Sequence, residues 1–340
     1  MAGRSKPHGR RMKVTVVGTG FGARVVAPAF DAVDGCEVVD VVSPRDERAV
    51  TRAIERLDVD LVSVHSPPFM HAQHVRAALG AGKAVLCDKP FAMNADEARE
   101  LAEEADAAGA IALCNFEFRF HAVRRLVRDL VRTNKLGRIE HVQWTHLSAG
   151  SRVPMRRYGW LFDRSRGGGW IGAWGSHAVD ALRWCFGEIT SVDARARIDV
   201  NERPDEQGHM HPCTAEDGLT ATLGVDGDIT VSIDTTFVAT APVPPRIVVL
   251  GASGVCELLA DERVLLRHAD GTREDLTPAA RVKRPGTDRH DGPMRRFAEV
   301  VRDVMTSGDV PPGVPTFADG LACDLVLDQF RAAPVVRRAH

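Results

Sequence analysis

In the N-terminal part of the chain, apolar positions alternate between two kinds of segment. Short and almost continuous apolar runs indicate buried strands, and the stretches between them carry apolar residues at helical spacing. The predicted strands are Lys13–Val17, Glu37–Val42, Asp60–His65, Lys83–Cys87 and Ile111–Asn115. The predicted helices are Phe21–Val33, Asp46–Leu57, Met70–Ala81, one that begins at Asn94, and His121–Thr133. This alternation favours a doubly wound parallel sheet with right-handed crossovers.

From Ile139 onward the pattern changes to longer stretches with β character. The predicted strands here are Ile139–Leu147, Ile189–Val200, Gly218–Val225, Ile229–Phe237, Arg246–Leu250 and Arg263–Arg267. Asp226-Gly227 is a turn signal between two of them. Two helices, Gly292–Thr306 and Phe317–Ala332, end the pattern. We therefore expect an α/β domain followed by an α+β domain, the second with a large, mostly antiparallel open sheet and flanking helices.

The length of the chain supports this division, because 340 residues exceed what one hydrophobic core usually serves. We expect a flexible arm at residues 1–11, a nucleotide-binding type of domain at 12–133, and an α+β domain for substrate and oligomerisation at 134–340. The terminal helices are placed in the second domain, with the alternative that they pack back on the first.

Composition narrows the class of protein. No apolar run approaches the roughly 20 residues needed to cross a bilayer, and the basic N-terminal segment has no signal-peptide core behind it. The formal net charge of −2 gives no nucleic-acid footprint. The 7 cysteines are odd in number and contain no C-x-x-C pair, which indicates buried thiols in a reducing compartment. We expect a cytoplasmic protein that binds neither nucleic acid nor membrane.

A glycine-rich segment follows the first predicted strand and begins the first helix. It consists of Gly18, Thr19, Gly20, Phe21, Gly22 and Ala23. In this context Gly18 allows the tight turn, Gly20 lets the backbone approach a diphosphate, and the small Ala23 allows helix-to-strand packing. The diphosphate then lies at the helix N-terminus. A methyltransferase loop and a purely structural turn are the alternatives.

The end of the second predicted strand bears on the choice of dinucleotide. Enzymes that use NAD usually place a carboxylate there to bind the ribose 2′-hydroxyl. Here Ser43 and Arg45 occupy the region, and both can bind a 2′-phosphate, with Arg48 as a further contributor. We therefore predict that NADP(H) is preferred. In the alternative interpretation Asp46 binds the ribose, and the cofactor is NAD(H).

Three segments together resemble one family. They are the glycine loop, His65-Ser66-Pro67-Pro68-Phe69-Met70-His71, and Gly82–Pro90, which ends in Asp88-Lys89-Pro90. Asn115–Phe120 and Gly167–Asp180 extend a similarity to the glucose-fructose oxidoreductase/inositol dehydrogenase/rhizopine catabolism (Gfo/Idh/MocA) family over nearly the whole chain. The resemblance implies a Rossmann domain at the N-terminus and a nucleotide lined by Ser66, Pro67, Pro68 and His71. In the family's Glu-Lys-Pro motif the lysine lies beside the nicotinamide and the substrate hydroxyl, so the resemblance assigns Asp88 and Lys89 to the cofactor site.

Lys89 is the first candidate for chemistry. Removal of a hydride from an alcohol requires a proton acceptor and a cation near the developing negative oxygen, and a lysine supplies the cation. We predict that Lys89 is catalytic and binds both cofactor and substrate. Without the resemblance, a lysine at a strand end is more often a surface residue.

His177 is the predicted acid/base and substrate ligand. Many members of the family carry an aspartate four residues before this histidine, where this chain has Ala173. Asp180 lies one turn after His177, on the same helical face if Ser176 caps the helix, and would orient the ring or bind a substrate hydroxyl. The alternatives are a core histidine and an acid that interacts with the helix dipole.

Two further residues complete the predicted site. Tyr158, the only tyrosine in the chain, is placed at the pocket as a proton donor and substrate ligand, with simple packing as an equal alternative. Arg119 resembles a family position near the cofactor cleft, with an interdomain ion pair as the alternative. His209 and His211 form an H-x-H without a third ligand, so we predict no metal site.

The predicted function is hydride transfer between NADP(H) and a secondary alcohol or carbonyl of a small sugar or cyclitol derivative. A nucleotide-binding regulatory protein that has lost turnover, suggested by Ala173, is the alternative from another class. We also expect a homodimer or homotetramer through the C-terminal sheet, because one face of that sheet needs cover. Specificity is assigned to the loops at Ser148–Asp163 and Asn201–Cys213.

Overall fold

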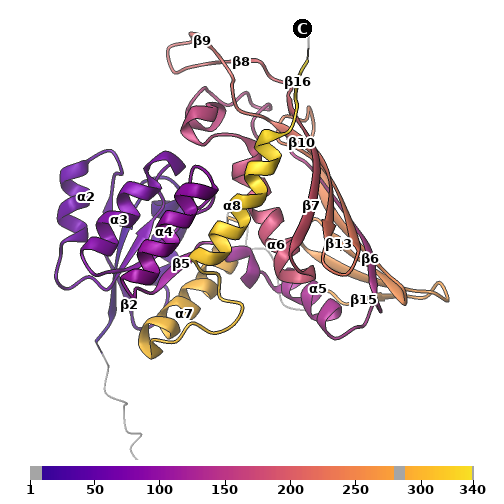
Figure 1. The fold of residues 1–340 in the computed structure, drawn as a ribbon, viewed down its shortest axis with the longest axis horizontal. Coiled ribbons are helices and arrows are strands. Elements are labelled where there is room, and N and C mark those ends of the chain that lie inside the picture. The colour runs from indigo at the N-terminus through magenta and orange to yellow at the C-terminus, as the bar shows by residue number, and fades with distance from the viewer. Residues whose placement is uncertain (1–9, 279–287, 339–340) are drawn as a thin grey trace, which may run out of the picture. The chain divides into compact units, whose positions relative to one another are not determined.

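The computed structural model describes residues 10–278 and 288–338, so most of the predicted N-terminal arm lies outside the described residues. Two compact units make up the described chain (Figure 1). Unit 1 consists of Met1–Ala92, Asp96–Glu117 and Pro285–Gly320, and unit 2 of Met93–Ala95, Phe118–Arg284 and Leu321–His340.

Unit 1 is built on a parallel sheet of five strands in the order β2-β1-β3-β4-β5. The strands are β1 (Met12–Val17), β2 (Cys36–Val42), β3 (Leu61–Val64), β4 (Ala84–Cys87) and β5 (Ala112–Cys114). Every residue of β3 is buried, as expected of a central strand with helices on both faces. All five predicted strands are therefore confirmed within one or two residues.

The helical elements of unit 1 also lie where the periodicity predicts them. They are the π-helical turn η1 (Gly22–Val26) that continues into α1 (Ala27–Asp31), α2 (Glu47–Ile54), the short η2 (Pro68–Met70), α3 (His71–Gly80), α4 (Ala95–Ala107) and α7 (Asp291–Ser307). The last of these comes from the C-terminal part of the chain. Met294, Phe297 and Val301 on α7 are fully buried, and the helix packs against η1 and α1.

Unit 2 contains a mixed sheet of nine strands in the order β15-β14-β13-β12-β6-β11-β10-β7-β16. They are β6 (Ile139–Leu147), β7 (Ile189–Ile198), β10 (Gly218–Val225), β11 (Ile229–Thr236), β12 (Val243–Gly251), β13 (Gly254–Leu259), β14 (Arg263–His268), β15 (Arg273–Asp275) and β16 (Val335–Arg337). Most neighbours are antiparallel, but β6 and β11 run parallel, as do β7 and β16. The predicted large, mostly antiparallel sheet is confirmed.

Alternation along the strands explains which face of this sheet is covered. In β11, Ile229, Val231 and Ile233 are buried, whereas Thr230 and Asp234 are exposed. The helices α5 (Ala122–Arg132) and α6 (Ser176–Phe186) accompany the sheet in Figure 1, with α8 (Phe317–Ala332) beside α6. Short turns connect these elements, namely η3 (Glu117–Phe120), η4 (Trp160–Phe162), η5 (Arg164–Arg166) and η6 (Ile171–Gly175).

Several strands of unit 2 were not predicted, namely β13, β15, β16 and the two strands of a hairpin. The strand β13 carries Glu257 among apolar residues, which breaks the strand pattern in the sequence. Its carboxylate binds Arg246 of β12 and Arg267 of β14, so the charge is compensated only after the sheet has formed. A two-stranded hairpin, β8 (Glu202–Pro204) and β9 (Met210–Pro212), was likewise assigned to a loop.

Candidate active site

The glycine loop joins β1 to η1, as the sequence predicts. Gly18 has a φ of +155°, and a Cβ on it would lie 2.5 Å from the carbonyl oxygen of His65. A Cβ on Gly22 would lie 2.9 Å from a methyl group of Val16. A Cβ on Gly20, in contrast, would meet no protein atom within 4 Å. The outer two glycines are therefore required by the protein's own packing, whereas Gly20 leaves space beside the backbone, which fits the approach of a dinucleotide diphosphate.

The strand order places this loop at a switch point of the sheet. β1 lies between β2 and β3, so the connections leaving β1 and β3 run in opposite directions. Ligands of open parallel sheets bind at the carboxyl ends of the strands at such a point. His65 is the first residue after β3, and its N–H donates to the carbonyl of Val17 at 2.8 Å. The end of β3 is thereby fixed to the end of β1.

The segment after β3 turns sharply through Pro67 and Pro68 into η2. His71, which begins α3, is buried, and its ring nitrogens contact the carbonyl oxygens of Ser66 at 2.8 Å and of Pro90 at 3.1 Å. Burial lowers the pKa of His71, although the charge of Asp88 opposes this shift. In this position His71 joins the segment after β3 to the segment after β4. Its predicted contact with the nucleotide stays a prediction.

Asp88 and Lys89 follow β4 at the same edge of the sheet. The Lys89 N–H donates to Asp88 Oδ1 at 2.9 Å, and Asn115 Nδ2 lies 3.2 Å from the same oxygen. His65 Nδ1 lies 3.2 Å from Asp88 Oδ2. Burial alone would raise the pKa of Asp88, but the neighbouring His65 and Lys89 hold it well below its usual range. The carboxylate is therefore ionised and keeps a negative charge beside the Lys89 backbone.

The end of β2 holds the residues on which the two interpretations of the ribose site depend. Asp46 is the N-cap of α2, and its Oδ1 accepts a hydrogen bond from the Ala49 N–H at 3.0 Å. Arg45 is exposed, and its own N–H points to Ser43 Oγ at 3.4 Å. The carboxylate required by the NAD interpretation is thus engaged in helix capping.

In unit 2, His177 lies in the first turn of α6 and is 5% exposed. Its ring packs against the ring of Phe118, with centroids 4.5 Å apart. The expectation that Ser176 caps this helix is wrong. The π-helical turn η6 runs directly into α6, so Ser176 is already helical, and its hydroxyl donates to the carbonyl of Gly172 at 2.7 Å.

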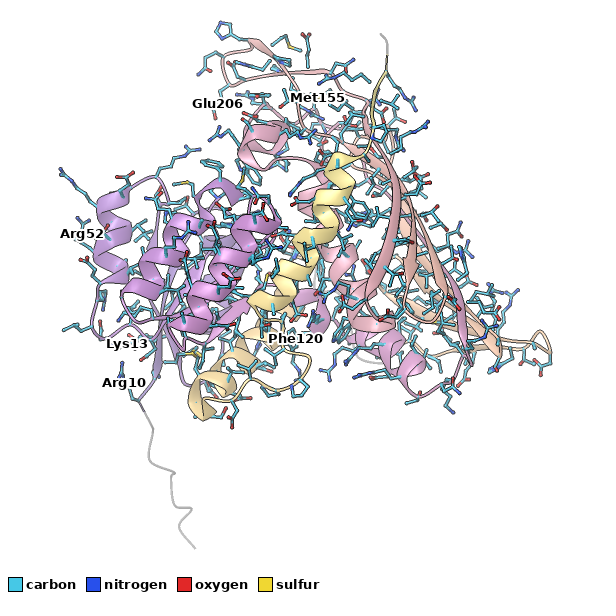
Figure 2. All side chains as sticks on the ribbon, viewed as in Figure 1. Arg10, Lys13, Arg52, Phe120, Met155 and Glu206 are labelled. Carbon is cyan, nitrogen blue, oxygen red and sulfur yellow. The ribbon has the colours of Figure 1, made fainter. Side chains whose placement is uncertain are left out.

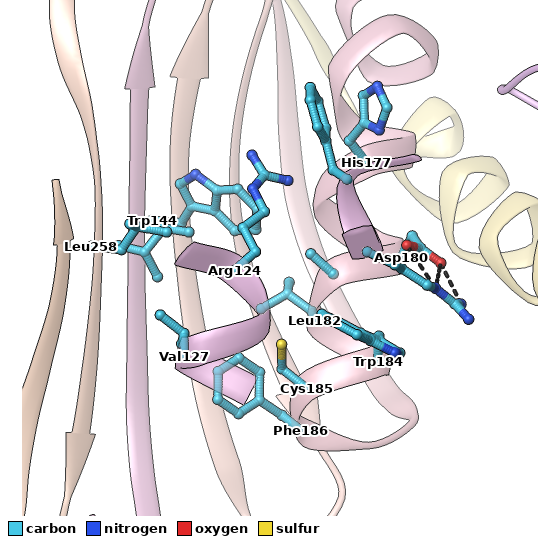
Figure 3. Close-up of a pocket in the computed structure, with 14 residues that line it drawn as sticks. Arg124, Val127, Trp144, His177, Asp180, Leu182, Trp184, Cys185, Phe186 and Leu258 are labelled. Atoms are coloured by element: carbon cyan, nitrogen blue, oxygen red, sulfur yellow. Dashed lines mark hydrogen bonds and ion pairs between the residues drawn. The ribbon is translucent and has the colours of Figure 1, made fainter. Parts of the chain in front are cut away.

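Arg119 and Asp180 bind each other within unit 2. Arg119 Nε donates to both carboxylate oxygens of Asp180 at 3.0 and 3.1 Å, and both side chains are 4% exposed. Asp180, with its ion pair drawn as dashed lines, and His177 both line a cavity between α5, α6 and the sheet (Figure 3). The cavity of about 30 Å³ has room for a water molecule but not for a sugar. As placed, the two side chains neutralise each other, and their contact with a substrate stays a prediction.

Tyr158 lies in the loop that we assigned to specificity. Its N–H donates to the carbonyl of Pro204 in β8 at 2.8 Å, and its ring stacks on His211 of β9 with centroids 4.8 Å apart. His211 Nε2 in turn lies 2.8 Å from Asp205 Oδ2. The two loops assigned to specificity are therefore parts of one structure. Burial raises the pKa of the Tyr158 phenol, so the proton stays on this side chain at neutral pH.

The structure adds two acidic groups that we did not select from the sequence. Glu216 is buried, accepts a hydrogen bond from the Ile171 N–H at 3.0 Å, and so lies at the start of the helix that carries His177. In unit 1, Glu117 binds His290 Nδ1 at 2.5 Å, and the His290 ring lies 5.1 Å from that of Phe21 in the glycine loop. Both contacts join segments far apart in the sequence, which single-sequence spacing does not reveal.

Two searches of the described residues bear on the class of protein. Residues 10–278 and 288–338 hold no group of three or more His, Cys, Asp or Glu side chains suited to a metal ion. None of the helices in this part of the chain combines the length and apolar character that a membrane crossing requires.

Comparison with known proteins defines the class. Residues 12–116 match "Oxidoreductase family, NAD-binding Rossmann fold", and residues 124–257 match "GFO/IDH/MocA C-terminal domain". The chain belongs to the Gfo/Idh/MocA family of oxidoreductases. The predicted family, the fold and the assignment to NAD(P)-dependent dehydrogenases and reductases are thereby confirmed.

Relatives of this chain carry the names of oxidoreductases. The uncharacterized oxidoreductase sll0816 of Synechocystis sp. is 27% identical over 348 residues, which span 95% of this chain and 94% of that protein. D-glucoside 3-dehydrogenase of Escherichia coli is 31% identical over 187 residues, 52% of each chain. The solved structure of levoglucosan dehydrogenase in complex with NADH and L-sorbose superposes with a TM-score of 0.81 at 18% identity, covering 94% of this chain and 96% of that one.

Proposed function

We propose that this protein transfers a hydride between NADP(H) and a secondary alcohol or carbonyl of a small sugar or cyclitol derivative. The observation that carries the proposal is the edge of the unit 1 sheet where the open glycine loop, the switch point and Lys89 occur together. The names of the relatives, which are dehydrogenases of glucosides and related sugars, support the substrate class.

The nucleotide would be held by four segments of unit 1. The glycine loop from Gly18 to Ala23 receives the diphosphate, Ser66–Pro68, His71 and Asp88 line the nucleotide, and Ser43 with Arg45 bind the 2′-phosphate. The Asp46 carboxylate caps α2, and the guanidinium of Arg45 can pair with a phosphate. A bound dinucleotide supplies the hydride acceptor or donor.

The chain's own side chains supply the rest of the chemistry. Lys89 stabilises negative charge on the substrate oxygen as its proton leaves. His177 accepts and returns that proton, and Tyr158 contributes to substrate binding. Ala173 stands one turn before His177, where many members of the family carry an aspartate, so the carboxylate of that position is replaced by a methyl group here.

Titration with NADPH and with NADH tests the cofactor assignment. Arg45→Ala should weaken binding of NADPH by about tenfold or more, because a charged hydrogen bond to the 2′-phosphate is lost, and leave NADH nearly unchanged. Arg52→Ala is the matched control, since Arg52 lies on the helix α2 that follows Arg45 and its loss changes the net charge equally (Figure 2). Equal weakening of both nucleotides by Arg45→Ala would refute the assignment to NADP(H).

A screen of sugars and cyclitols then tests turnover. Lys89→Met and His177→Asn should each lower kcat by at least about a hundredfold in any reaction that is found. A protein that binds the nucleotide tightly, oxidises or reduces no member of the screen, and loses nothing with Lys89→Met would instead support the regulatory alternative suggested by Ala173.

Quaternary structure and location belong to the same proposal. A homodimer or homotetramer would use the face of the large sheet that the helices leave open, where residues such as Thr222 and Asp234 are exposed. Sedimentation at micromolar concentration decides this, and a monomer would refute it. A cytoplasmic location agrees with the seven cysteines, all of which are free thiols.

A further inference from the structure

A chain of polar side chains crosses three strands of unit 1 at the switch point. Ser63 lies on β3, His65 directly after it, Asp88 directly after β4 and Asn115 directly after β5. Ser63 Oγ is 2.7 Å from His65 Nε2, and His65 Nδ1 is 3.2 Å from Asp88 Oδ2. Asp88 Oδ1 receives the N–H of Lys89 at 2.9 Å and lies 3.2 Å from Asn115 Nδ2. The predicted chemistry of Lys89 makes no use of Ser63 or His65.

Charge decides which His65 nitrogen carries the proton. Asp88 is ionised, so a lone pair on Nδ1 facing its carboxylate would be repelled, whereas an N–H at Nδ1 is attracted. The Ser63 hydroxyl then donates to Nε2. The contact of His65 with Asp88 at 3.2 Å is therefore electrostatic and not an aligned hydrogen bond, and Asp88 in turn accepts the backbone N–H of Lys89.

The row of polar side chains is buried at its Ser63 end. Ser63 has no exposed surface, and the His65 side chain is fully buried. This end of the row of side chains is therefore enclosed by the protein. An enclosed row of polar contacts is suited to fixing geometry at Lys89.

The same histidine supports the glycine loop. A Cβ on Gly18 would lie 2.5 Å from the His65 carbonyl oxygen, and one on Gly22 would lie 3.0 Å from the His65 Cβ. The Phe21 ring lies 5.9 Å from the His65 ring. A shift of His65 would therefore move both the loop that receives the diphosphate and the carboxylate that holds Lys89.

We propose that His65 is a positioning residue: through Asp88 it fixes Lys89 in register with the glycine loop, so that a nucleotide seated on the loop meets the lysine ammonium at a set place. The inference rests on the proposed function, in which Lys89 lies beside the nicotinamide.

The charge of the nicotinamide ring gives a readout that needs no substrate. The ring is positive when oxidised and neutral when reduced, so a nearby ammonium weakens binding of the oxidised form relative to the reduced form. At a separation of several ångströms in a partly buried site, this repulsion raises the dissociation constant of the oxidised form over that of the reduced form by a factor of roughly three to ten. Displacement of Lys89 should reduce the ratio of the two dissociation constants.

Two near-isosteric variants separate the two contacts of His65. The amide nitrogen of Asn at position 65 lies close to the place of Nδ1 and can still donate to Asp88, whereas the longer Gln reaches toward Ser63 in place of Nε2. The full-length wild type, Lys89→Met, His65→Asn and His65→Gln are titrated with NADP⁺ and NADPH. Lys89→Met and His65→Gln should each lower the ratio of the dissociation constants of NADP⁺ and NADPH at least about threefold. His65→Asn should keep this ratio within about twofold of the wild type.

The outcomes separate this inference from the proposed function. An unchanged ratio in Lys89→Met would mean that Lys89 does not lie beside the nicotinamide. That outcome overturns both the proposed function and the role of His65. If the ratio of the dissociation constants of NADP⁺ and NADPH falls in Lys89→Met but is unchanged in His65→Gln, only the role of His65 is overturned. An equal fall in His65→Asn and His65→Gln also overturns the role of His65 alone.

Amide exchange of Lys89 in the wild type keeps the test open if a variant fails to fold. Its N–H is donated to the Asp88 carboxylate, so we expect exchange at least about a hundredfold slower than in an unstructured peptide. Exchange at the unstructured rate would overturn the positioning role.

Discussion

The glycines of the nucleotide loop differ in backbone conformation and in how closely other protein atoms approach them. Gly18 combines a φ that side chains rarely adopt with the close approach of the His65 carbonyl. Gly20 has neither constraint toward the protein. The first glycine is therefore a requirement of folding, and the second is a requirement of whatever binds the loop.

Alanine at these two positions should separate stability from binding. Gly18→Ala should lower the free energy of unfolding by roughly 2 kcal/mol or more, because strain and overlap add. Gly20→Ala should leave it within about 0.5 kcal/mol and weaken nucleotide binding at least about tenfold, since the new methyl group occupies the diphosphate's approach. Denaturation and nucleotide titration of both variants measure this, and an unaffected affinity in Gly20→Ala would contradict it.

His74 makes the stability of unit 1 depend on pH. Burial lowers its pKa from 6.5 to about 4, and its Nδ1 lies 3.0 Å from Ser66 Oγ. Above pH 6.5 the ring is neutral in both states, and the full stability is present. As the pH falls from 6.5 toward 4, the unfolded chain binds the proton first, so stability is lost.

His74→Gln should therefore reduce acid sensitivity. Between pH 7.5 and 4.5 we expect the wild type to lose roughly 2 kcal/mol more than this variant. Denaturant unfolding at both pH values measures the difference. His209→Gln is the control, because His209 is exposed, and an equal effect of the two variants would argue against a role for burial.

At this scale the sequence identified residues whose role follows from local spacing. The glycine pattern after a strand and the lysine before Pro90 are of this kind. It did not identify His65 or Glu216, whose partners Asp88 and Ile171 lie 23 and 45 residues away, because only the packed chain brings them together.

Among the elements, η3 and α6 are joined by the ion pair of Arg119 and Asp180. Both side chains are almost completely buried, and two donor nitrogens of the arginine meet the carboxylate. Burial of either charge without the other is far more costly than burial of the pair.

Loss of one partner should therefore cost more than loss of both. We expect Arg119→Met to lower the free energy of unfolding by about 3 to 5 kcal/mol and the double variant with Asp180→Leu to recover at least about half of that loss. Chemical denaturation provides the comparison, with the exposed Arg125→Met as control. A double variant that is less stable than Arg119→Met alone would contradict this expectation, because Asp180 would then stabilise the fold in the absence of Arg119.

The elements themselves were largely predictable where one rule governs a segment. Parallel strands of unit 1 are short apolar runs, and the helices between them keep their periodicity. The strand β13 and the start of α6 were not, because Glu257 is neutralised by neighbouring strands and the π-helical turn before Ser176 leaves no capping signal.

For the whole molecule, the two units should respond differently to the nucleotide. The proposed nucleotide contacts all come from unit 1. At a concentration about 100 times the dissociation constant, NADPH should stabilise the folded state by about 2.7 kcal/mol. Hydrogen exchange should slow in β1, β3 and β4 and change little in β10 and β11. Equal slowing in β10 and β11 would place the nucleotide elsewhere.

The origin of α7 sets a limit on how the protein can be made. Unit 1 takes its last helix from Asp291–Ser307, after the chain has passed through every strand of the nine-stranded sheet except β16. During synthesis the N-terminal sheet therefore emerges from the ribosome long before Phe297 and Val301 arrive to cover α1. Until then the nascent Rossmann sheet exposes apolar surface, and a gene fragment that ends at residue 116 would encode a nucleotide-binding half with one helix missing.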